Sequence, residues 1–136
     1  MSGSETSQGF GEHGAFTVSV ADDPRLAEIV HELTRRTAEM SGCSEPDAAH
    51  LADAASAVAS ALGHDLDLAY RPMPHALILE LRPGRRGDNA ASLHAVLAAG
   101  DAFARVKQLV PAAELQGSGG DEFCFLTCPR AEAEAS

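Results

Sequence analysis

Four stretches of this chain are predicted to be β-strands; hydrophobic and polar residues alternate along the first, and the last is rich in β-forming residues. The stretches are AFTVSV at 15–20, DLDLAY at 65–70, HALILELR at 75–82 and EFCFLTC at 122–128. A Pro-rich turn, RPMP at 71–74, joins the middle two. We therefore expect these two strands to form an antiparallel hairpin.

A helical period of hydrophobic residues follows the first predicted strand. Asp23 is the expected N-cap, Pro24 the first helical residue, and Gly42 the stop at the C-terminal end. The buried face of this helix is predicted to comprise Leu26, Ile29, Val30, Leu33, Thr37 and Met40.

A second helix is predicted to begin at SEPD, residues 44–47, with Ser44 as its N-cap, and to end at Gly63. Its predicted core positions are Leu51, Ala54, Ala55, Val58 and Leu62. A third helical stretch covers 90–110, either continuous or broken at Gly100, and ends before Pro111.

The predicted order of elements is β, α, α, β, β, α, followed by one or two strands. This order predicts an α/β two-layer sandwich, with the helices on one face of a mixed, mostly antiparallel sheet. We expect one folded domain over 15–130. The Gly- and Ser-rich residues 1–14 and the closing residues 131–136 are predicted to be disordered tails.

The net charge of the 136-residue chain is −10, which argues against a broad nucleic-acid surface and favours a basic protein partner. Nothing in the sequence is typical of a signal peptide or a membrane span, so we expect a cytoplasmic protein.

Cys124 and Cys128 would lie about 13 Å apart on one strand face, too far to bridge each other. With Cys43 they are expected to be reduced thiols. The six histidines lack metal-ligand spacing, so no metal site is predicted.

The second predicted helix contains the stretch HLADAASAVASALGHD at 50–65, in which Ser56 and Ser60 are one turn apart. Residues with this spacing share a helix face. The plain interpretation is a close-packed or solvent-contacting face, because Ser is only neutral inside helices. A second interpretation depends on the rest of the chain.

Four segments of the chain carry a resemblance to a known family. They are FTVSVADDPRLAEIVHELT, MSGCSEPDAAHL, and the closing pair AGDAFARVKQLV and GGDEFCFLTC. In this order and at this length, the chain resembles the small anti-sigma-factor serine kinases of bacterial partner-switching systems. The resemblance implies the histidine-kinase-like ATPase (Bergerat, or GHKL) fold over nearly the whole folded region.

Active members of that family carry an N-box, E-x-x-x-N-A, often followed by His, that faces the phosphates of ATP. In this chain Ser56 occupies the position of the Glu and Ser60 that of the Asn. Ala61 and His64 match the Ala and the His of the pattern. A serine hydroxyl has too high a pKa for a general base at neutral pH. It is also a poor substitute for the amide oxygen that helps to hold Mg²⁺.

The family's D-x-G element, whose Asp binds the adenine amino group, corresponds to Arg82 and Gly84. Arginine has only donors and cannot accept that hydrogen bond. The ATP lid is predicted to be shortened, with Gly100 as the remnant of its second glycine motif. The resemblance thus implies a vestigial nucleotide site and no ATP or Mg²⁺ cofactor.

These losses favour a non-catalytic regulator, a pseudokinase that binds a sigma factor or an anti-sigma antagonist. The resemblance also implies a homodimer, and an apolar first strand would otherwise leave a sheet edge exposed. The alternative enzyme is a divergent serine kinase that binds ATP, with Asp53 or Asp65 as the replacement base. No catalytic residue is assigned under the first hypothesis.

A third hypothesis is a sensor of a phosphate-bearing ligand such as a nucleotide second messenger. It depends on the anion-binding capacity of guanidinium groups. Four of the ten basic residues gather around the predicted hairpin: Arg71, Arg82, Arg85 and Arg86. The alternative is a solvated loop whose arginines neutralise nearby acids.

Overall fold

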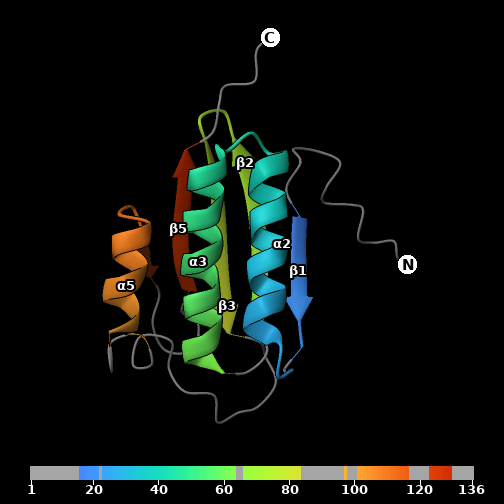
Figure 1. Ribbon diagram of the computed structural model, residues 1–136, viewed down its shortest axis with the longest axis vertical. Helices are drawn as coiled ribbons and strands as arrows, with labels where there is room; N and C mark the ends of the chain where they lie inside the picture. The colour runs from blue at the N-terminus through green and yellow to red at the C-terminus, as the bar shows by residue number, and fades with distance from the viewer. Residues whose placement is uncertain are drawn as a thin grey trace, which may run out of the picture.

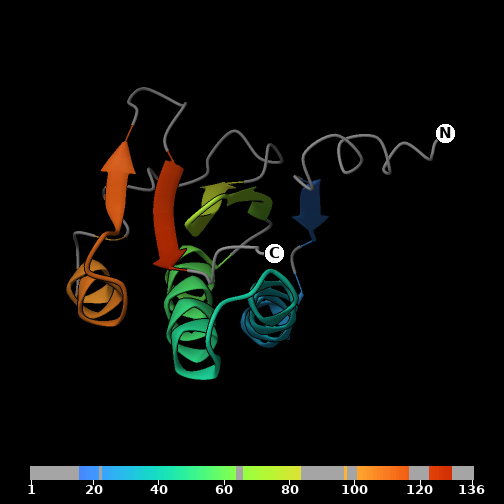
Figure 2. The ribbon, with the colours of Figure 1, turned by 90° about the horizontal axis from the view of Figure 1, so that it is seen from above.

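The described part of the chain folds into two layers, with helices on one face of a sheet (Figure 1). The computed structural model describes residues 16–21, 23–63, 66–83, 97, 101–116 and 123–129. The two predicted tails, 1–14 and 131–136, lie outside these ranges. The predicted α/β sandwich with its helices on one face is confirmed for the described residues (Figure 2).

The elements follow the predicted order, and two strands come after the last helix. They are β1 (Phe16–Val20), α2 (Leu26–Met40), α3 (Glu45–Leu62), β2 (Leu66–Met73), β3 (Ala76–Pro83), α5 (Ala102–Leu109), β4 (Glu114–Gln116) and β5 (Phe123–Pro129). Of the predicted helical stretch 90–110, only Leu97 and the residues from Asp101 onward are described. The α5 helix begins at Ala102 and ends before Pro111, and this end is the predicted one.

The five described strands form one sheet in the order β1-β2-β3-β5-β4. Every pair of neighbours is antiparallel, so the prediction of a mixed sheet is wrong for these strands. The reason is that β2 and β3 form a hairpin and β5 returns antiparallel to β3, so that no described pair is parallel. Strands β1 and β4 are the two edges.

The β2–β3 hairpin turns more tightly than the sequence predicted. Met73 pairs with Ala76, which leaves only two residues in the turn and places Arg71–Met73 inside β2. Pro72 is tolerated there because proline is acceptable where a strand has no partner on one side. The described part of β1 reaches only the level of Tyr70.

The ends of α2 are set by local hydrogen bonds. The predicted N-cap is wrong, because the helix begins at Leu26 with Arg25 as N-cap. Asp23 lies just before the helix, and its carboxylate accepts a hydrogen bond from the Arg25 N–H at 2.7 Å. The predicted stop is confirmed, since Gly42 has a φ of +98° and the Cys43 N–H donates to the Ala38 carbonyl at 3.0 Å.

The buried face of α2 is rotated from the predicted one. The buried residues are Leu26, Val30, Thr34 and Ala38, whereas Ile29 is 37 % exposed and Met40 is 86 % exposed. A polar residue can lie in this row because the Thr34 and Tyr70 hydroxyls share a hydrogen bond of 2.8 Å. This contact fixes α2 over β2.

Helix α3 has the predicted ends and the predicted core positions. The Ser44 hydroxyl accepts the Asp47 N–H at 3.2 Å, and Gly63 ends the helix with a φ of +74°. Leu51, Val58 and six other residues are buried on α3: Ala48, Ala52, Ala54, Ala55, Ala59 and Leu62. The small side chains let α3 approach α2, α5 and β5 closely.

The strands meet the helices with one alternating set of side chains. The core-facing residues are Leu66, Leu68, Tyr70, Leu77, Leu79, Leu81, Cys124, Leu126 and Cys128. The intervening residues lie on the opposite face of the sheet, which no described element covers. We call this second surface the open face.

The first prediction tests the buried side of α3. Val58→Asp should lower the free energy of unfolding by more than about 3 kcal/mol, because it places an unpaired carboxylate at a position with 0 % exposure. Urea unfolding followed by circular dichroism measures the change. Ser60→Asp is the matched control on the same helix; Ser60 is exposed, and the loss should stay within about 1 kcal/mol. Equal effects of both variants would contradict the assigned face.

The second prediction concerns Tyr70, which is the only tyrosine of the chain. Burial raises its pKa from 10.0 to about 12, while the hydrogen bond with Thr34 acts in the opposite direction. The unfolded chain therefore ionises first, and stability is lost as the pH rises from about 10 to about 12. Tyrosinate absorbance should titrate near pH 12 in the folded protein and near 10 in urea. A folded-state titration near 10 would contradict the buried position.

Candidate functional site

The two serines that were expected at N-box positions, Ser56 and Ser60, both lie on α3. Ser56 is half-buried, and its hydroxyl donates to the Asp53 backbone carbonyl at 3.4 Å. Ser60 is exposed to solvent. The Ser56 hydroxyl thus bonds to the backbone of its own helix, which is a common arrangement of serine within helices.

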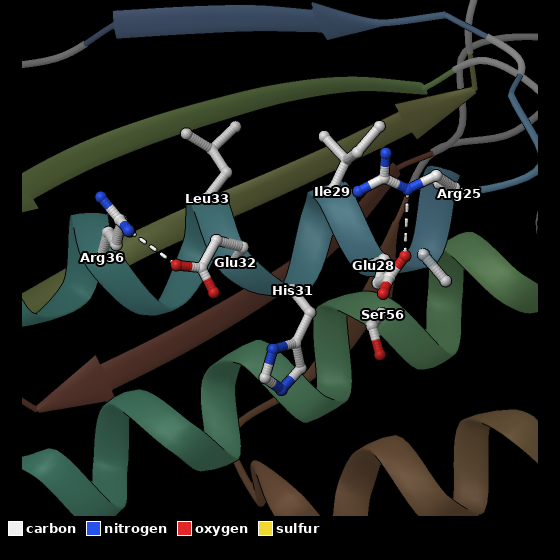
Figure 3. Close-up of a pocket in the computed structure, with 9 residues that line it drawn as sticks. Arg25, Glu28, Ile29, His31, Glu32, Leu33, Arg36 and Ser56 are labelled. Carbon is white, nitrogen blue, oxygen red and sulfur yellow. Dashed lines mark hydrogen bonds and ion pairs between the residues drawn. The ribbon is translucent and has the colours of Figure 1, made fainter.

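Ser56 also lines a surface groove beside α2 (Figure 3). The charged side chains of this groove are paired with each other. Arg25 Nε lies 3.2 Å from Glu28 Oε1, and Arg36 Nε lies 2.6 Å from Glu32 Oε2. The Arg36 hydrogen bond and contacts with Arg35 lower the pKa of Glu32, against a smaller opposing effect of burial. Exposed pairs of this kind contribute little to stability and leave little uncompensated charge for a ligand.

A histidine–aspartate contact connects α2 to α3 beside the same groove. His31 Nε2 lies 2.8 Å from Asp53 Oδ1. Asp53 is one of the two replacement bases that the kinase alternative requires, and its carboxylate contacts this imidazole. Ser56 donates to the Asp53 carbonyl, so Asp53, His31 and Ser56 are neighbours without forming the nucleophile–base–carboxylate chain of a hydrolase.

Arg82 lies on the other side of the sheet from the two serines. Its strand neighbours Leu79 and Leu81 are buried in the helix-facing core, whereas Arg82 shares the open face with Glu80. The structure therefore does not bring Arg82 together with Ser56 and Ser60. His64, Gly84 and Gly100 lie outside the described residues, as do Asp65, Arg85, Arg86 and the predicted shortened lid.

Arg82 belongs instead to a cluster on the open face, the sheet-face cluster, which comprises Arg71, Glu80, Arg82, Phe123 and Phe125. Arg82 Nε donates to Glu80 Oε2 at 2.6 Å, and its guanidinium lies 4.3 Å from the centre of the Phe123 ring. Arg71 Nη2 lies 3.8 Å from Glu80 Oε1. The rings of Phe123 and Phe125 meet edge to face, with centres 5.0 Å apart.

The sheet-face cluster joins three strands, β2 to β3 through the Glu80 carboxylate and β3 to β5 through the Arg82–Phe123 contact. Glu80 on β3 is 8 % exposed and lies between Arg71 on β2 and Arg82. The Arg82 guanidinium lies over the face of the Phe123 ring on β5, which is a cation–π contact. The arginine and phenylalanine side chains together form a partly apolar surface.

Sequence reasoning grouped Arg71 with Arg82 but missed Glu80 and Phe123. The alternation along LILELR does place Glu80 and Arg82 on one strand face. The position of Phe123 required the register of β5 against β3, in which Leu81 pairs with Cys124. The His31–Asp53 contact likewise joins residues that are distant in the sequence, and no local pattern indicates it.

Other kinds of site find no support in the described ranges. No group of three or more His, Cys, Asp or Glu side chains there is arranged to hold a metal ion. None of the helices in those ranges combines the length and the hydrophobicity needed to cross a membrane. No protein-family model matches the chain, and comparison with curated protein sequences finds no match.

Proposed function

We propose that this protein is a non-catalytic regulator of the anti-sigma or partner-switching type, with a GHKL-like fold, which binds a protein partner through its open face. The observation that carries the proposal is the sheet-face cluster. It combines a guanidinium stacked on Phe123 with a buried carboxylate, on a surface that none of the described elements covers.

The arrangement of elements supports the GHKL part of the proposal. Two long helices follow the first strand, a hairpin follows them, and α5 is followed by two further strands. All three described helices lie on the same face of the sheet (Figure 2). This is the order and the layering that the family resemblance implies.

The positions of the serines support a regulator without kinase activity. A kinase must hold the phosphates of ATP and a metal ion in one place. Ser56 offers neither a carboxylate nor an amide and donates to its own helix backbone. The carboxylate of Asp53, one of the two replacement bases, contacts His31.

The composition of the open face supports a protein as the partner. Arginine and aromatic residues are enriched in the energetic centres of protein interfaces. Met73 is 42 % exposed at the end of β2, and the half-buried Ile78 adds apolar area on β3. The net charge of −10 suits a basic partner, and we favour a basic segment of a sigma factor over an antagonist.

A sensor of phosphate-bearing ligands receives less support from the same cluster. Arg71 and Arg82 are the two described members of the predicted anion-binding group, and both contact Glu80. A phosphate would have to compete with this buried carboxylate. A homodimer remains part of the proposal, because β1 lies at an edge of the sheet, where the described part of β1 pairs only with β2.

The third prediction is that the protein does not bind ATP. Calorimetric titration with ATP and Mg²⁺ should give no measurable heat, and no phosphate should be transferred to an antagonist protein. Ser56→Glu and Ser60→Asn should each remain inactive. Adding Arg82→Asp to both should restore weak binding at most, because position 82 lies across the sheet from α3. Micromolar affinity of the parent protein for ATP would establish the kinase alternative instead.

The fourth prediction tests the partner and its surface. The purified protein should bind a sigma factor and inhibit transcription by it without ATP. Phe123→Ala should weaken this binding about tenfold or more, since it removes the aromatic support of Arg82. Ile29→Ala is the matched control: Ile29 is a partly exposed hydrophobic residue of α2, and its loss should leave the affinity unchanged.

The outcomes of this binding experiment separate the alternatives. Thermal melting must show both variants folded, and light scattering of the complexes measures whether two copies of this chain are present. If only Ile29→Ala bound the sigma factor more weakly, the interface would lie on the helical layer and not on the open face. Binding of an antagonist but of no sigma factor would reverse the choice of partner, and binding of neither would contradict the proposed function.

A further inference from the structure

Two carboxylates lie on the open face outside the sheet-face cluster. They are Asp67 on β2 and Glu114 on β4. The Ser19 hydroxyl donates to Asp67 Oδ1 at 2.8 Å, and the Gln116 side-chain amide donates to Glu114 Oε1 at 2.8 Å. Both donors are neutral, and among the described residues no arginine, lysine or histidine pairs with either carboxylate. Neither the fold nor the sheet-face cluster uses these two negative charges.

The strand register places the two carboxylates at opposite ends of neighbouring rows of side chains. Successive residues of the first row, from β1 to β4, are Ser19, Asp67, Arg82, Phe123 and Gln116. Those of the second row are Thr17, Ala69, Glu80, Phe125 and Glu114. A line from Asp67 to Glu114 therefore crosses the sheet-face cluster. The line spans three strand spacings and one row, which is a distance of about 16 Å.

The centre of this line differs in charge from its two ends. At the centre the Arg82 guanidinium lies 4.3 Å from the centre of the Phe123 ring. Glu80 is buried and contacts both Arg71 and Arg82, so arginine is the charge that a bound segment meets there. A cationic side chain is therefore repelled from the centre of the line and attracted to its ends.

We propose that the open face binds an amphipathic helix of the partner, which has two basic residues about three turns apart and hydrophobic residues between them. Three turns of an α-helix are about 11 residues and rise about 16 Å, which matches the separation of Asp67 and Glu114. Hydrophobic residues about 4 and 7 positions after the first basic residue point to the same side and reach the phenylalanine rings. This inference rests on the proposed function, because it specifies the partner segment that the same face binds.

A helix fits this spacing better than an extended segment does. Side chains on one side of a strand repeat every two residues, so the separations available near this length are about 14 and 20 Å. A helix also fits the layers of the fold. The described helices cover one face of the sheet, and a helix on the open face gives a third layer (Figure 2). The stems of lysine and arginine can lie along the apolar surface while their charged ends reach the carboxylates.

The test uses a synthetic peptide in place of the partner helix. Its lysines are at the third and fourteenth positions and its leucines at the seventh and tenth, and alanine and glutamine fill the rest. Titration of the isotope-labelled full-length protein should shift nuclear magnetic resonance signals of amides in β3 and β5 and leave those of α2 in place. A second peptide, in which the first leucine and the second lysine are exchanged, should bind at least about fivefold more weakly, because it places a lysine over Arg82.

Two near-isosteric substitutions test the carboxylates. Asp67→Asn and Glu114→Gln each remove one charge and keep an acceptor for the neighbouring donor. Each should raise the Kd of the first peptide about twofold to fivefold, and both together about tenfold. Glu45→Gln is the matched control, since Glu45 is exposed at the start of α3 in the helical layer. It removes the same charge and should change the Kd by less than about 1.5-fold.

The results distinguish this inference from the proposed function. Binding of a sigma factor that depends on Phe123 but on neither carboxylate would overturn the inference alone. Peptide binding that requires both carboxylates, in a protein that binds no sigma factor, would contradict the proposed function alone.

Other results would also overturn the proposed helix site. One is the absence of peptide binding, and another is an equal effect of Glu45→Gln and Asp67→Asn, which would show that only the net charge matters. If the same amide signals shifted with protein concentration in the absence of peptide, a second copy of the chain would be the occupant of the open face.

Discussion

Helix α3 has neighbours on three sides, because α2 and α5 flank it and β5 lies against it. Helices approach each other to about 8 Å only where the side chains between them are small. The alanines of α3 meet this requirement, while Leu51, Val58 and Leu62 fill the remaining space. The serines occupy what is left of the helix surface: Ser60 faces solvent, and Ser56 lies at the edge towards α2. Their positions thus follow from the packing of α3, with or without an ancestral nucleotide site.

The features that the sequence predicts well are those that depend on neighbouring residues. Gly42, Ser44 and Gly63 were predicted as helix ends because capping uses hydrogen bonds within a few residues. The buried face of α2 was predicted wrongly, because Thr34 enters the core only through a hydroxyl that lies 36 residues away, on Tyr70. A hydrophobicity pattern ranks Met40 above Thr34, and the contact with Tyr70 reverses that order.

The candidate site was less predictable than the fold, because it depends on contacts between residues that are distant in the sequence. The family pattern placed Arg82 beside a nucleotide, but the alternation of β3 turns its side chain to the face away from α3. The Glu80 carboxylate pairs with Arg71 on β2 and with Arg82 on β3, and Phe123 on β5 packs against Arg82. These contacts depend on strand register, which a single sequence does not specify across a long connection. The vestigial-site interpretation remains a hypothesis: of its residues, Ser56 and Ser60 lie on α3 and Arg82 on the other face of the sheet, while His64, Gly84 and Gly100 lie outside the described residues.

Strand β5 contributes to both faces of the sheet. Its outward residues include Phe123 and Phe125 of the sheet-face cluster, while Cys124, Leu126 and Cys128 on the inward side belong to the core. The period of two along a strand separates these roles, so a change in the core does not alter the outward side chains directly. The two aromatic residues lie where β5 is paired with β4, and Phe125 is also opposite Glu80 on β3. The backbone under the aromatic part of the sheet-face cluster is therefore held from both sides, and this part of the open face is expected to keep its shape when a partner binds.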